Sequence, residues 1–543
     1  MTVPLPVAGC PGMHFSKRSF LSVYHHDMLY TTMTCRASLT LLLLLVVPTV
    51  LPRSAQAAAL RVSDATVVVE GDEAFVEVDV SWRLSWRTDT NWDAAWLVAK
   101  VQGSRGDIHV PLAPTGHRMT ANAGSERPGA VIKGTADRMG VFVYRDAVAD
   151  GRGSNDWTLR LKMALPDDVD PRGLPSPVRV HGVEMVYVPS GPFSVGDPRG
   201  INGPDKAFFG VSSDSTGTYR ITSSGPIRLC DGPNTLCDAE TAVEDGPGRL
   251  PTEYPNGYDA FYLMKYEVTQ GQYAAFLNGL SNRQSAQHDI IAGRNYGRMR
   301  GGIALAGNRY IADRPDRACN FLSWSNAAAY ADWAGLRPMT ELEHTKAARG
   351  PADPVAGEYA WGSTAIAHGD TLFNPDTSLA RGEDGDEFIR GNANYSPASR
   401  PWQRGYGATY VGGDGGAGPL RVDIFETQAY RTDAADKRAA SGAGYYGALG
   451  LSGSLYERVV TATDTVGHRF RGSHGNGDPA YPGWATNDDW PTRDGEGLGL
   501  RGGATSGYAS GIRLARRTYA DYDGSYRFGM GGLRAARTAP HVE

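Results

Sequence analysis

Few residues of this chain have the types and spacing that catalysis, metal binding or disulfide formation requires. The cysteines are the first candidates. Cys230 and Cys237 flank a turn-rich hexapeptide, and no histidine stands close to them in the sequence. A zinc site built on two thiolates needs further ligands nearby, so the pair favours a disulfide that closes a small loop in an oxidising compartment. Cys319 precedes the apolar pair Phe321 and Leu322, which is typical of a small buried hydrophobic residue.

Histidines offer a weaker candidate for a metal site. His468 and His474 lie in a glycine-rich segment, and Asp478 and Asp488 follow them. Histidines in loops are most often surface residues, so this set stays an alternative. The sequence has no Gly-x-Ser-x-Gly segment to place a nucleophilic serine, and the glycine-rich residues 412–418 lack the lysine of a phosphate loop.

The N-terminal region predicts export. Residues 33–57 contain the three parts of a secretory signal: an arginine, an apolar run and an Ala-x-Ala cleavage site. The apolar run is shorter than the roughly 20 residues that cross a bilayer as a helix. Residues 1–32 match no targeting element, so we expect them to be untranslated or dispensable, with translation starting at Met28 or Met33. We expect a secreted or periplasmic bacterial protein without a transmembrane anchor.

The composition is that of a globular protein with many loops. Of the 543 residues, 41% are hydrophobic and 21% are charged, and the 68 glycines favour tight turns. The net charge of −5 excludes the basic surface of a nucleic-acid-binding protein.

Strand patterns fill residues 60–165. Valines 76, 78 and 80 alternate with polar residues, and residues 94–99 form a continuous apolar run. Further strands are predicted over residues 137–144 and 157–163, so the region reads as a small antiparallel β-sandwich. The proline-rich residues 166–181 predict a stiff linker to a second domain.

Helix signals appear in that second domain. Thr269 is followed three residues later by Gln272, and Thr340 by Glu343, which predicts two capping boxes at helix starts. A third helix is expected after Ser323, where alanine and aromatic residues recur.

Several segments, which follow one another in the same order as in the family, resemble the formylglycine-generating enzyme, or sulfatase-modifying factor, family. The resemblance covers residues 183–537 and closes with Arg501-Gly-Gly, a run from Ile512 to Arg517 expected to be a strand, and Gly532-Leu-Arg. It implies an α+β, loop-rich fold related to C-type lectins. The other segments are residues 185–196, 261–273, 323–333, 337–349, 358–362, 392–394 and 447–458.

The resemblance also implies cofactor positions. The two cysteines that bind copper in the family's oxidases fall on Gly507 and Ile512, which offer no thiolate, so we do not expect copper or the oxidation of cysteine to formylglycine. A structural calcium would take oxygens from one set of residues, although Gly450 lacks the side-chain oxygen of the family. That set is Asn394, Glu457 and the carbonyls of Tyr395, Gly453 and Leu455.

Glu457 has an alternative role as a buried carboxylate paired with an arginine of the C-terminal segment, such as Arg513 or Arg516.

The C-terminal region is rich in Tyr, Ser and Gly, the composition of adaptable binding loops. We therefore expect a scaffold that binds a peptide, protein or glycan ligand. One alternative is an atypical envelope enzyme, a metal- or oxygen-dependent oxidoreductase built around Glu267 and Glu457. Another is a binding protein diversified by a retroelement. The aromatic residues expected to contact the ligand are Trp484, Trp490, Tyr508, Tyr519, Tyr522 and Tyr526.

Overall fold

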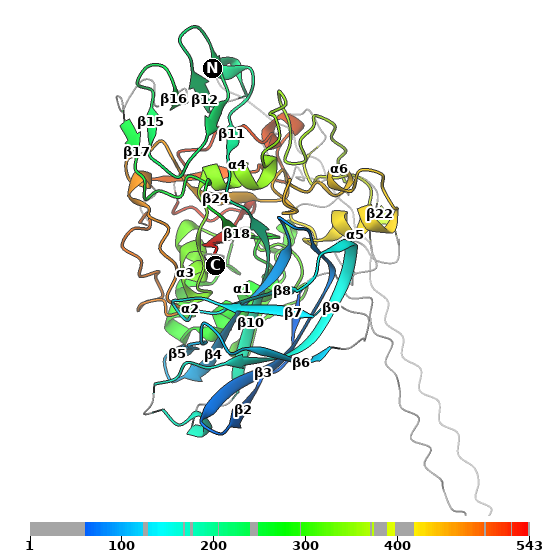
Figure 1. The fold of residues 1–543 in the computed structure, drawn as a ribbon, viewed down its shortest axis with the longest axis vertical. Helices are drawn as coiled ribbons and strands as arrows, with labels where there is room; N and C mark the ends of the chain where they lie inside the picture. Colours follow the sequence, from blue (N-terminus) through cyan, green and yellow to red (C-terminus); the bar gives the residue numbers. More distant parts are fainter. Residues whose placement is uncertain are drawn as a thin grey trace, which may run out of the picture. The chain divides into compact units, whose positions relative to one another are not determined.

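A computed structural model describes most of the chain from residue 60 onward, and it consists mainly of strands and loops (Figure 1). The predicted extension 1–32 and signal 33–57 lie outside the described residues. The described ranges are 60–122, 129–166, 169–173, 177–204, 206–238, 248–293, 295–369, 372–373, 388–396, 418–492, 496–522 and 524–540.

The first strands build a five-stranded sheet around the antiparallel pair of β3 and β9. In β3 the valines 76, 78 and 80 are buried, as their alternation predicts, and the polar residues between them are more exposed. The strands are β1 (Arg61–Val62), β2 (Thr66–Glu70), β3 (Glu73–Arg87), β6 (Arg118–Asn122) and β9 (Ala149–Lys162).

A second sheet of eight strands joins the two halves of the sequence. Its order is β21-β27-β18-β10-β4-β8-β7, with β5 paired to β4. Strand β10 pairs antiparallel with β4 from Val178 to Val186 and with β18 from Met185 to Val188. Strand β10 therefore begins inside the predicted linker. The bounds are β4 (Asp93–Gly103), β5 (Gly106–Val110), β7 (Ala130–Gly134), β8 (Val141–Arg145), β10 (Val178–Val188), β18 (Phe261–Met264), β21 (Arg337–Pro338) and β27 (Ala535–Thr538).

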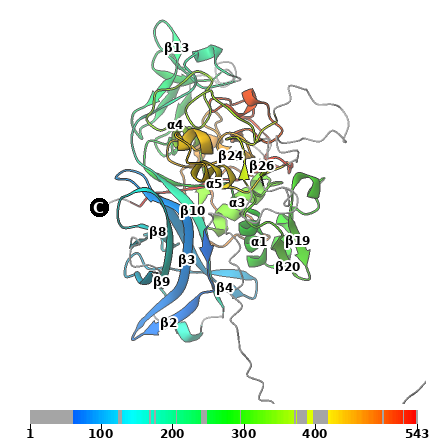
Figure 2. The same cartoon turned by 90° about the vertical axis from the view of Figure 1, so that its right-hand side faces the viewer.

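Strand β4 is buried on both faces, which confirms the buried strand expected from its apolar run. Leu97 and Ala99 pack in one core with Val78 of β3. Trp96 and Val98 point to the opposite face, into a core that contains residues of helices α1 and α3. Figure 2 shows β3 on one side of β10 and these two helices on the other.

Both predicted capping boxes are present, and both cap helices. Thr269 accepts from Gln272 N at the start of α1, and Thr340 accepts from Glu343 N at the start of α4. Ser323 caps α3 in the same way. None of the helices in the described ranges is long and apolar enough to span a bilayer. They are α1 (Gln270–Gly279), α2 (Asn282–His288), α3 (Trp324–Trp333), α4 (Glu341–Arg349), α5 (Ile424–Arg431) and α6 (Lys437–Ser441).

Small sheets organise the remaining loops. A three-stranded sheet holds β24 (Tyr456–Val460) between β25 (Leu498–Arg501) and β26 (Gly531–Gly532). The other strands are β11 (Phe193–Val195), β12 (Phe209–Val211), β13 (Thr216–Gly217), β14 (Tyr219–Ile221), β15 (Ile227–Leu229), β16 (Thr235–Cys237), β17 (Gly248–Leu250), β19 (Ile303–Ala306), β20 (Arg309–Ala312), β22 (Leu372–Phe373) and β23 (Phe388–Ile389).

The strand expected from Ile512 to Arg517 is wrong. A 3₁₀ turn covers Ala509–Ile512, and residues 513–517 continue as an irregular loop. Ile512 and Leu514 are both buried, so the alternation that suggested a strand is real, but side chains hold this backbone: Arg501 donates to the Leu514 carbonyl. The strand expected over residues 137–144 begins only at Val141.

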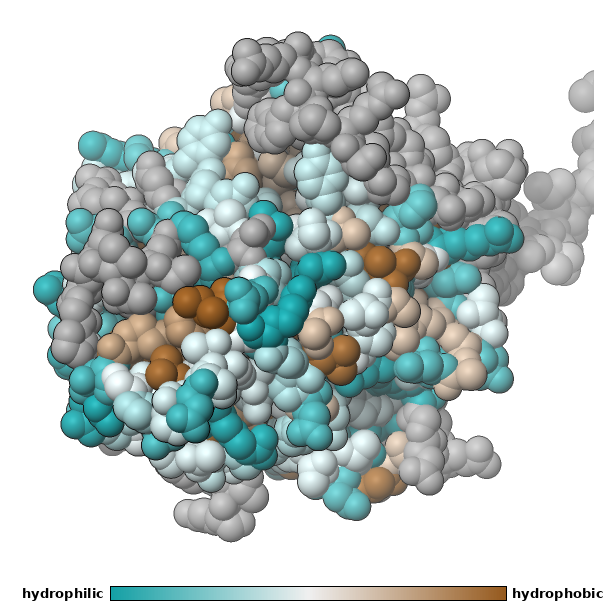
Figure 3. All heavy atoms as spheres, turned by 90° about the horizontal axis from the view of Figure 1, so that it is seen from above, coloured by the Kyte–Doolittle hydropathy of each residue, from teal (hydrophilic) through white to brown (hydrophobic). Residues whose placement is uncertain are grey.

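On the face drawn in Figure 3, hydrophobic residues form small separate patches among polar ones. The described residues visible on that face therefore form no broad apolar area for docking.

Candidate functional site

Positions 507 and 512 face each other at the C-terminal segment. A Cβ atom placed on Gly507 would lie 3.5 Å from Cγ2 of Ile512, because the 3₁₀ turn between them folds the chain back. Ile512 is fully buried. The fold thus brings together the two positions at which the family resemblance implies cysteines, and their side chains offer no metal ligand.

Cys319 does not replace the missing thiols. It is buried and not part of a disulfide, and it packs in the core with the helices α1 and α3, whereas Ile512 belongs to a different core. Burial raises the pKa of its thiol well above the ordinary value. A thiol of this kind is a poor nucleophile and a poor metal ligand.

Glu457 forms a buried ion pair with Arg534. The guanidinium Nε donates to Glu457 Oε1 at 2.7 Å, and both side chains are fully buried. Arg534 also donates to the carbonyls of Met264, Lys265 and Leu449. Burial raises the pKa of Glu457 to about 6, although Arg534 acts in the opposite direction.

The predicted arginine partners of Glu457, Arg513 and Arg516, are therefore wrong, while the predicted pairing with a C-terminal arginine is right. Strand β26 pairs in parallel with β24 at Glu457, and Arg534 follows β26 by two residues. This pairing could not be read from a two-residue strand of glycines.

Glu267, expected at the family's cleft, sits beside this ion pair. Its carboxylate accepts from Leu455 N at 2.9 Å and from Ser454 Oγ at 3.0 Å. Burial raises its pKa to about 8, and the negative charge of Glu457 adds to the shift, while Arg534 opposes it. Two neighbouring acids are thus held in the interior, and the charge of Arg534 acts on both.

The residues expected to bind calcium fit that ion only in part. Asn394 lies beside Gly453, and its carbonyl accepts from Ser454 N at 2.9 Å. Glu457 Oε2 is buried without a hydrogen-bond partner, but Oε1 is taken by Arg534. Across the described residues, no three or more His, Cys, Asp or Glu side chains are grouped to hold a metal ion. His468, His474, Asp478 and Asp488 are among the described residues and form no such group.

A cavity of about 300 Å³ lies next to Glu267, between β1, β10 and α1. Its lining includes Glu184 and the ion pair of Arg61 with Asp316. Glu184 accepts from Lys265 at 2.7 Å through Oε1, whereas its Oε2 is buried without a hydrogen-bond partner. Burial raises the pKa of Glu184 to about 8, against the lowering effect of Lys265.

Aromatic side chains form a continuous cluster on the C-terminal surface. Tyr519 lies 5.4 Å from Tyr456 and 5.8 Å from Tyr522 between ring centroids. Phe528 lies 5.6 Å from Tyr522 and stacks on Tyr526 at 5.9 Å. Tyr519 is 38% exposed and Tyr526 is 59% exposed. We call these five residues the C-terminal aromatic cluster.

Three of the six predicted contact residues, Tyr519, Tyr522 and Tyr526, meet in this cluster. Tyr508 is exposed and precedes the 3₁₀ turn. Sequence reasoning missed Tyr456 and Phe528, although Tyr456 is the aromatic residue that opens β24 and Phe528 follows Tyr526 by two residues.

The two predicted tryptophans lie elsewhere. Trp490 is 5% exposed and donates through Nε1 to the Ser473 carbonyl, so it is a core residue and not a platform for ligand. Trp484 is half-buried and packs edge-on against His288. The loop that carries them folds over α2 and α3, where Trp484 contacts His288 and the Trp324 indole donates to the Pro491 carbonyl.

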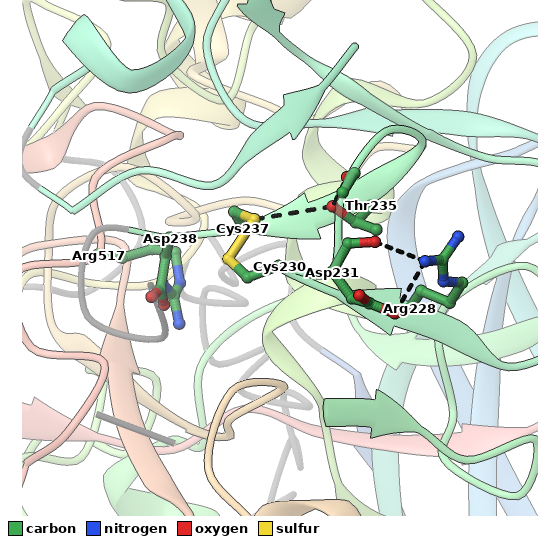
Figure 4. Close-up of a disulfide and its surroundings, with 8 residues drawn as sticks. Arg228, Cys230, Asp231, Thr235, Cys237, Asp238 and Arg517 are labelled. Atoms are coloured by element: carbon green, nitrogen blue, oxygen red, sulfur yellow. Dashed lines mark hydrogen bonds and ion pairs between the residues drawn. A yellow bond between two sulfur atoms is a disulfide. The ribbon is translucent and has the colours of Figure 1, made fainter. Parts of the chain in front are cut away.

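A disulfide joins Cys230 and Cys237, with their Cα atoms 5.0 Å apart (Figure 4). Asp238 follows Cys237 directly and bonds to the guanidinium of Arg517. Arg517 in turn donates to Glu341 at the start of α4. The disulfide loop is therefore tied to the C-terminal segment through a buried ionic network.

Comparison with known proteins finds one matching family and two similar enzymes. Residues 172–539 match the family described as "Sulfatase-modifying factor enzyme 1-like domain". The chain is 44% identical to a formylglycine-generating enzyme of Thermomonospora curvata over 59 residues, which are 11% of this chain and 19% of the relative.

It is also 28% identical to a formylglycine-generating enzyme of Streptomyces coelicolor over 165 residues, which are 26% of this chain and 51% of the relative. The chain thus spans about half the length, or less, of these two relatives. Because the family match covers more than half of the sequence, the chain belongs to the family of sulfatase-modifying factor enzyme 1-like domains.

Proposed function

We propose that this protein is a secreted or periplasmic member of its family that binds a peptide or glycan through the C-terminal aromatic cluster and does not oxidise cysteine. Two observations together support the proposal. The aromatic cluster is exposed, and the facing positions 507 and 512 lack thiols. We also propose that the fold of the family domain is related to that of C-type lectins.

The cluster has the physical properties of a ligand platform. Tyrosine offers a flat apolar ring for stacking and a hydroxyl for hydrogen bonding, at a low cost in side-chain entropy. The rings of Tyr519, Tyr522 and Phe528 support one another, so the exposed edge is held in place before a ligand arrives.

The test is a screen of the mature protein on glycan and peptide arrays, followed by titration of any ligand found. Tyr526→Ala and Tyr519→Ala should each weaken binding by roughly tenfold, because losing a stacking contact costs about 1 to 2 kcal/mol. Tyr481→Ala is the matched control, since Tyr481 is 65% exposed and lies outside the cluster. Equal binding by all three variants would rule the cluster out.

A second candidate is an atypical envelope enzyme, and the cavity beside Glu267 favours it. Glu267 and Glu184 have pKa values raised to about 8, which suits proton transfer near neutral pH. Incubation of the mature protein with a cysteine-containing peptide, copper and oxygen, followed by mass spectrometry, tests the family's oxidation. Formylglycine formation would overturn the first proposal.

Calcium is proposed as a structural ion at Asn394 and the neighbouring carbonyls. Adding calcium to chelator-treated protein should then raise the melting temperature, and Asn394→Ala should reduce that gain. Identical melting curves with calcium and with chelator would remove this ion from the proposal.

A further inference from the structure

A second pocket, of about 220 Å³, opens where three distant parts of the sequence meet. Strand β9 contributes Arg152, helices α5 and α6 contribute Tyr430, Lys437 and Arg438, and the loop before residue 447 contributes Tyr445. This pocket is separate from the C-terminal aromatic cluster, from the cavity beside Glu267 and from the positions 507 and 512.

The pocket is lined by three cationic side chains and by no carboxylate of the described residues. Among the described residues, Arg438 donates to the backbone carbonyls of Ala348, Ala360 and Ala443. No carboxylate of these residues forms an ion pair with Arg438. Burial lowers its pKa, which is the expected response of a cation that lacks a close anion, although Glu358 and Asp436 raise its pKa from farther away.

The two other cations are only partly neutralised. Arg152 lies 3.5 Å from Glu426, donates through Nε to the Tyr430 hydroxyl, and leaves its buried Nη1 without a hydrogen-bond partner. Lys437 pairs with Asp433, but that carboxylate is 97% exposed, so water screens the pair strongly.

Aromatic rings hold these cations in place. The guanidinium of Arg152 lies 3.5 Å above the Trp86 ring, and that of Arg438 lies 5.3 Å from the Tyr445 ring centre. Lys437 lies 5.6 Å from the Tyr430 ring. Such contacts fix the direction of the charges and leave flat apolar walls beside them.

We propose that this pocket binds a small molecule that carries an oxyanion, a carboxylate, phosphate or sulfate group, on a body of about monosaccharide size. Guanidinium groups match the geometry of such oxyanions, and the aromatic walls suit a ring attached to the anion. The volume of the pocket sets the size of the body.

The test is calorimetric titration of the full mature chain with inorganic phosphate, sulfate, glucose 6-phosphate and glucose. Glucose 6-phosphate should bind more tightly than either free anion, glucose should not bind, and added salt should weaken binding. Arg152→Gln and Lys437→Gln each remove a charged hydrogen-bond donor from the pocket. Each variant should therefore bind glucose 6-phosphate roughly tenfold more weakly.

Arg309→Gln is the matched control, because Arg309 is an exposed cation of the β19–β20 hairpin outside the pocket. Lys437→Gln protects the test against misfolding, since Lys437 is partly exposed and can lose its charge with little effect on packing. Absence of anion binding, or binding that both pocket variants retain at the level of Arg309→Gln, would overturn the proposal.

Discussion

Residues 507 and 512 lie close enough that two thiols placed there could bind the same metal ion. A Cβ atom on Gly507 would lie 3.0 Å from the Ala504 carbonyl oxygen, a tight contact that requires a small shift of the backbone, and 3.5 Å from Ile512 Cγ2. What this segment lacks for Cu(I) is therefore sulfur, and not proximity.

The double variant Gly507→Cys with Ile512→Cys should bind one Cu(I) tightly, measured by competition with a coloured Cu(I) chelator. Each single variant should bind much more weakly, because linear dithiolate coordination needs both sulfurs. The Ile512 change should cost about 2 kcal/mol of stability, as buried methyl groups are lost. A double variant that competes no better than the singles would show that the two positions do not meet.

The raised pKa of Glu267 predicts how the free energy of unfolding depends on pH. Its pKa is raised to about 8 in the folded protein, whereas an unfolded glutamate titrates near its ordinary value of roughly 4.3. Between those values the folded state holds a proton that the unfolded state has lost, so its contribution to stability is lost as pH rises toward 8.

Thermal unfolding from pH 5 to pH 8 should therefore show a smaller decline for Glu267→Gln than for the natural protein. The amide keeps the shape and can still accept from Leu455 N, but it does not titrate. Glu253→Gln, at an exposed position, should follow the natural protein. Parallel pH profiles for all three proteins would contradict a raised pKa at Glu267.

At the scale of elements, the sequence predicted those helices and strands that are determined by neighbouring residues. The capping boxes at Thr269 and Thr340, and the buried strand β4, follow from spacing and apolar content alone. The loop after Ile512 could not be predicted in this way, because the side chain of Arg501 holds its backbone. The partner of Glu457 depended on β26, a strand too short to leave a sequence pattern.

The same limit applies to the candidate site. Three tyrosines of the C-terminal segment meet because they are close in sequence, whereas Trp490 is buried in the core that contains residues of α1 and α3. Exposure of an aromatic residue in an irregular segment is set by tertiary contacts, which residue type alone does not report.

The disulfide loop predicts a stability effect at this scale. Changing both Cys230 and Cys237 to Ser should lower the free energy of unfolding by about 2 kcal/mol, because the short loop gains freedom in the unfolded chain. Loosening β16 should also weaken the bond between Asp238 and Arg517. Denaturant titration measures the change, and a reducing agent should affect the natural protein but not the variant. An unchanged midpoint in the variant would rule out this role of the loop.

For the whole molecule, the decisive feature is the sheet that joins residues 60–165 to the rest of the described chain. Strand β10 pairs with β4 along nine residues, and β4 supplies Trp96 and Val98 to the same core as helices α1 and α3. Removing residues 60–165 would leave the β10 edge unpaired and open that core to water.

A chain that starts at residue 166 should therefore fail to fold, although it contains the whole family match. The full chain should unfold in one cooperative step, with tryptophan fluorescence and circular dichroism changing together in urea. Two separate transitions, or a soluble fragment with a native-like spectrum, would show that the domains are independent. Lys265→Met offers a milder probe, because the buried Lys265 ammonium donates to Glu184 of β10, and its loss should lower the single transition without splitting it.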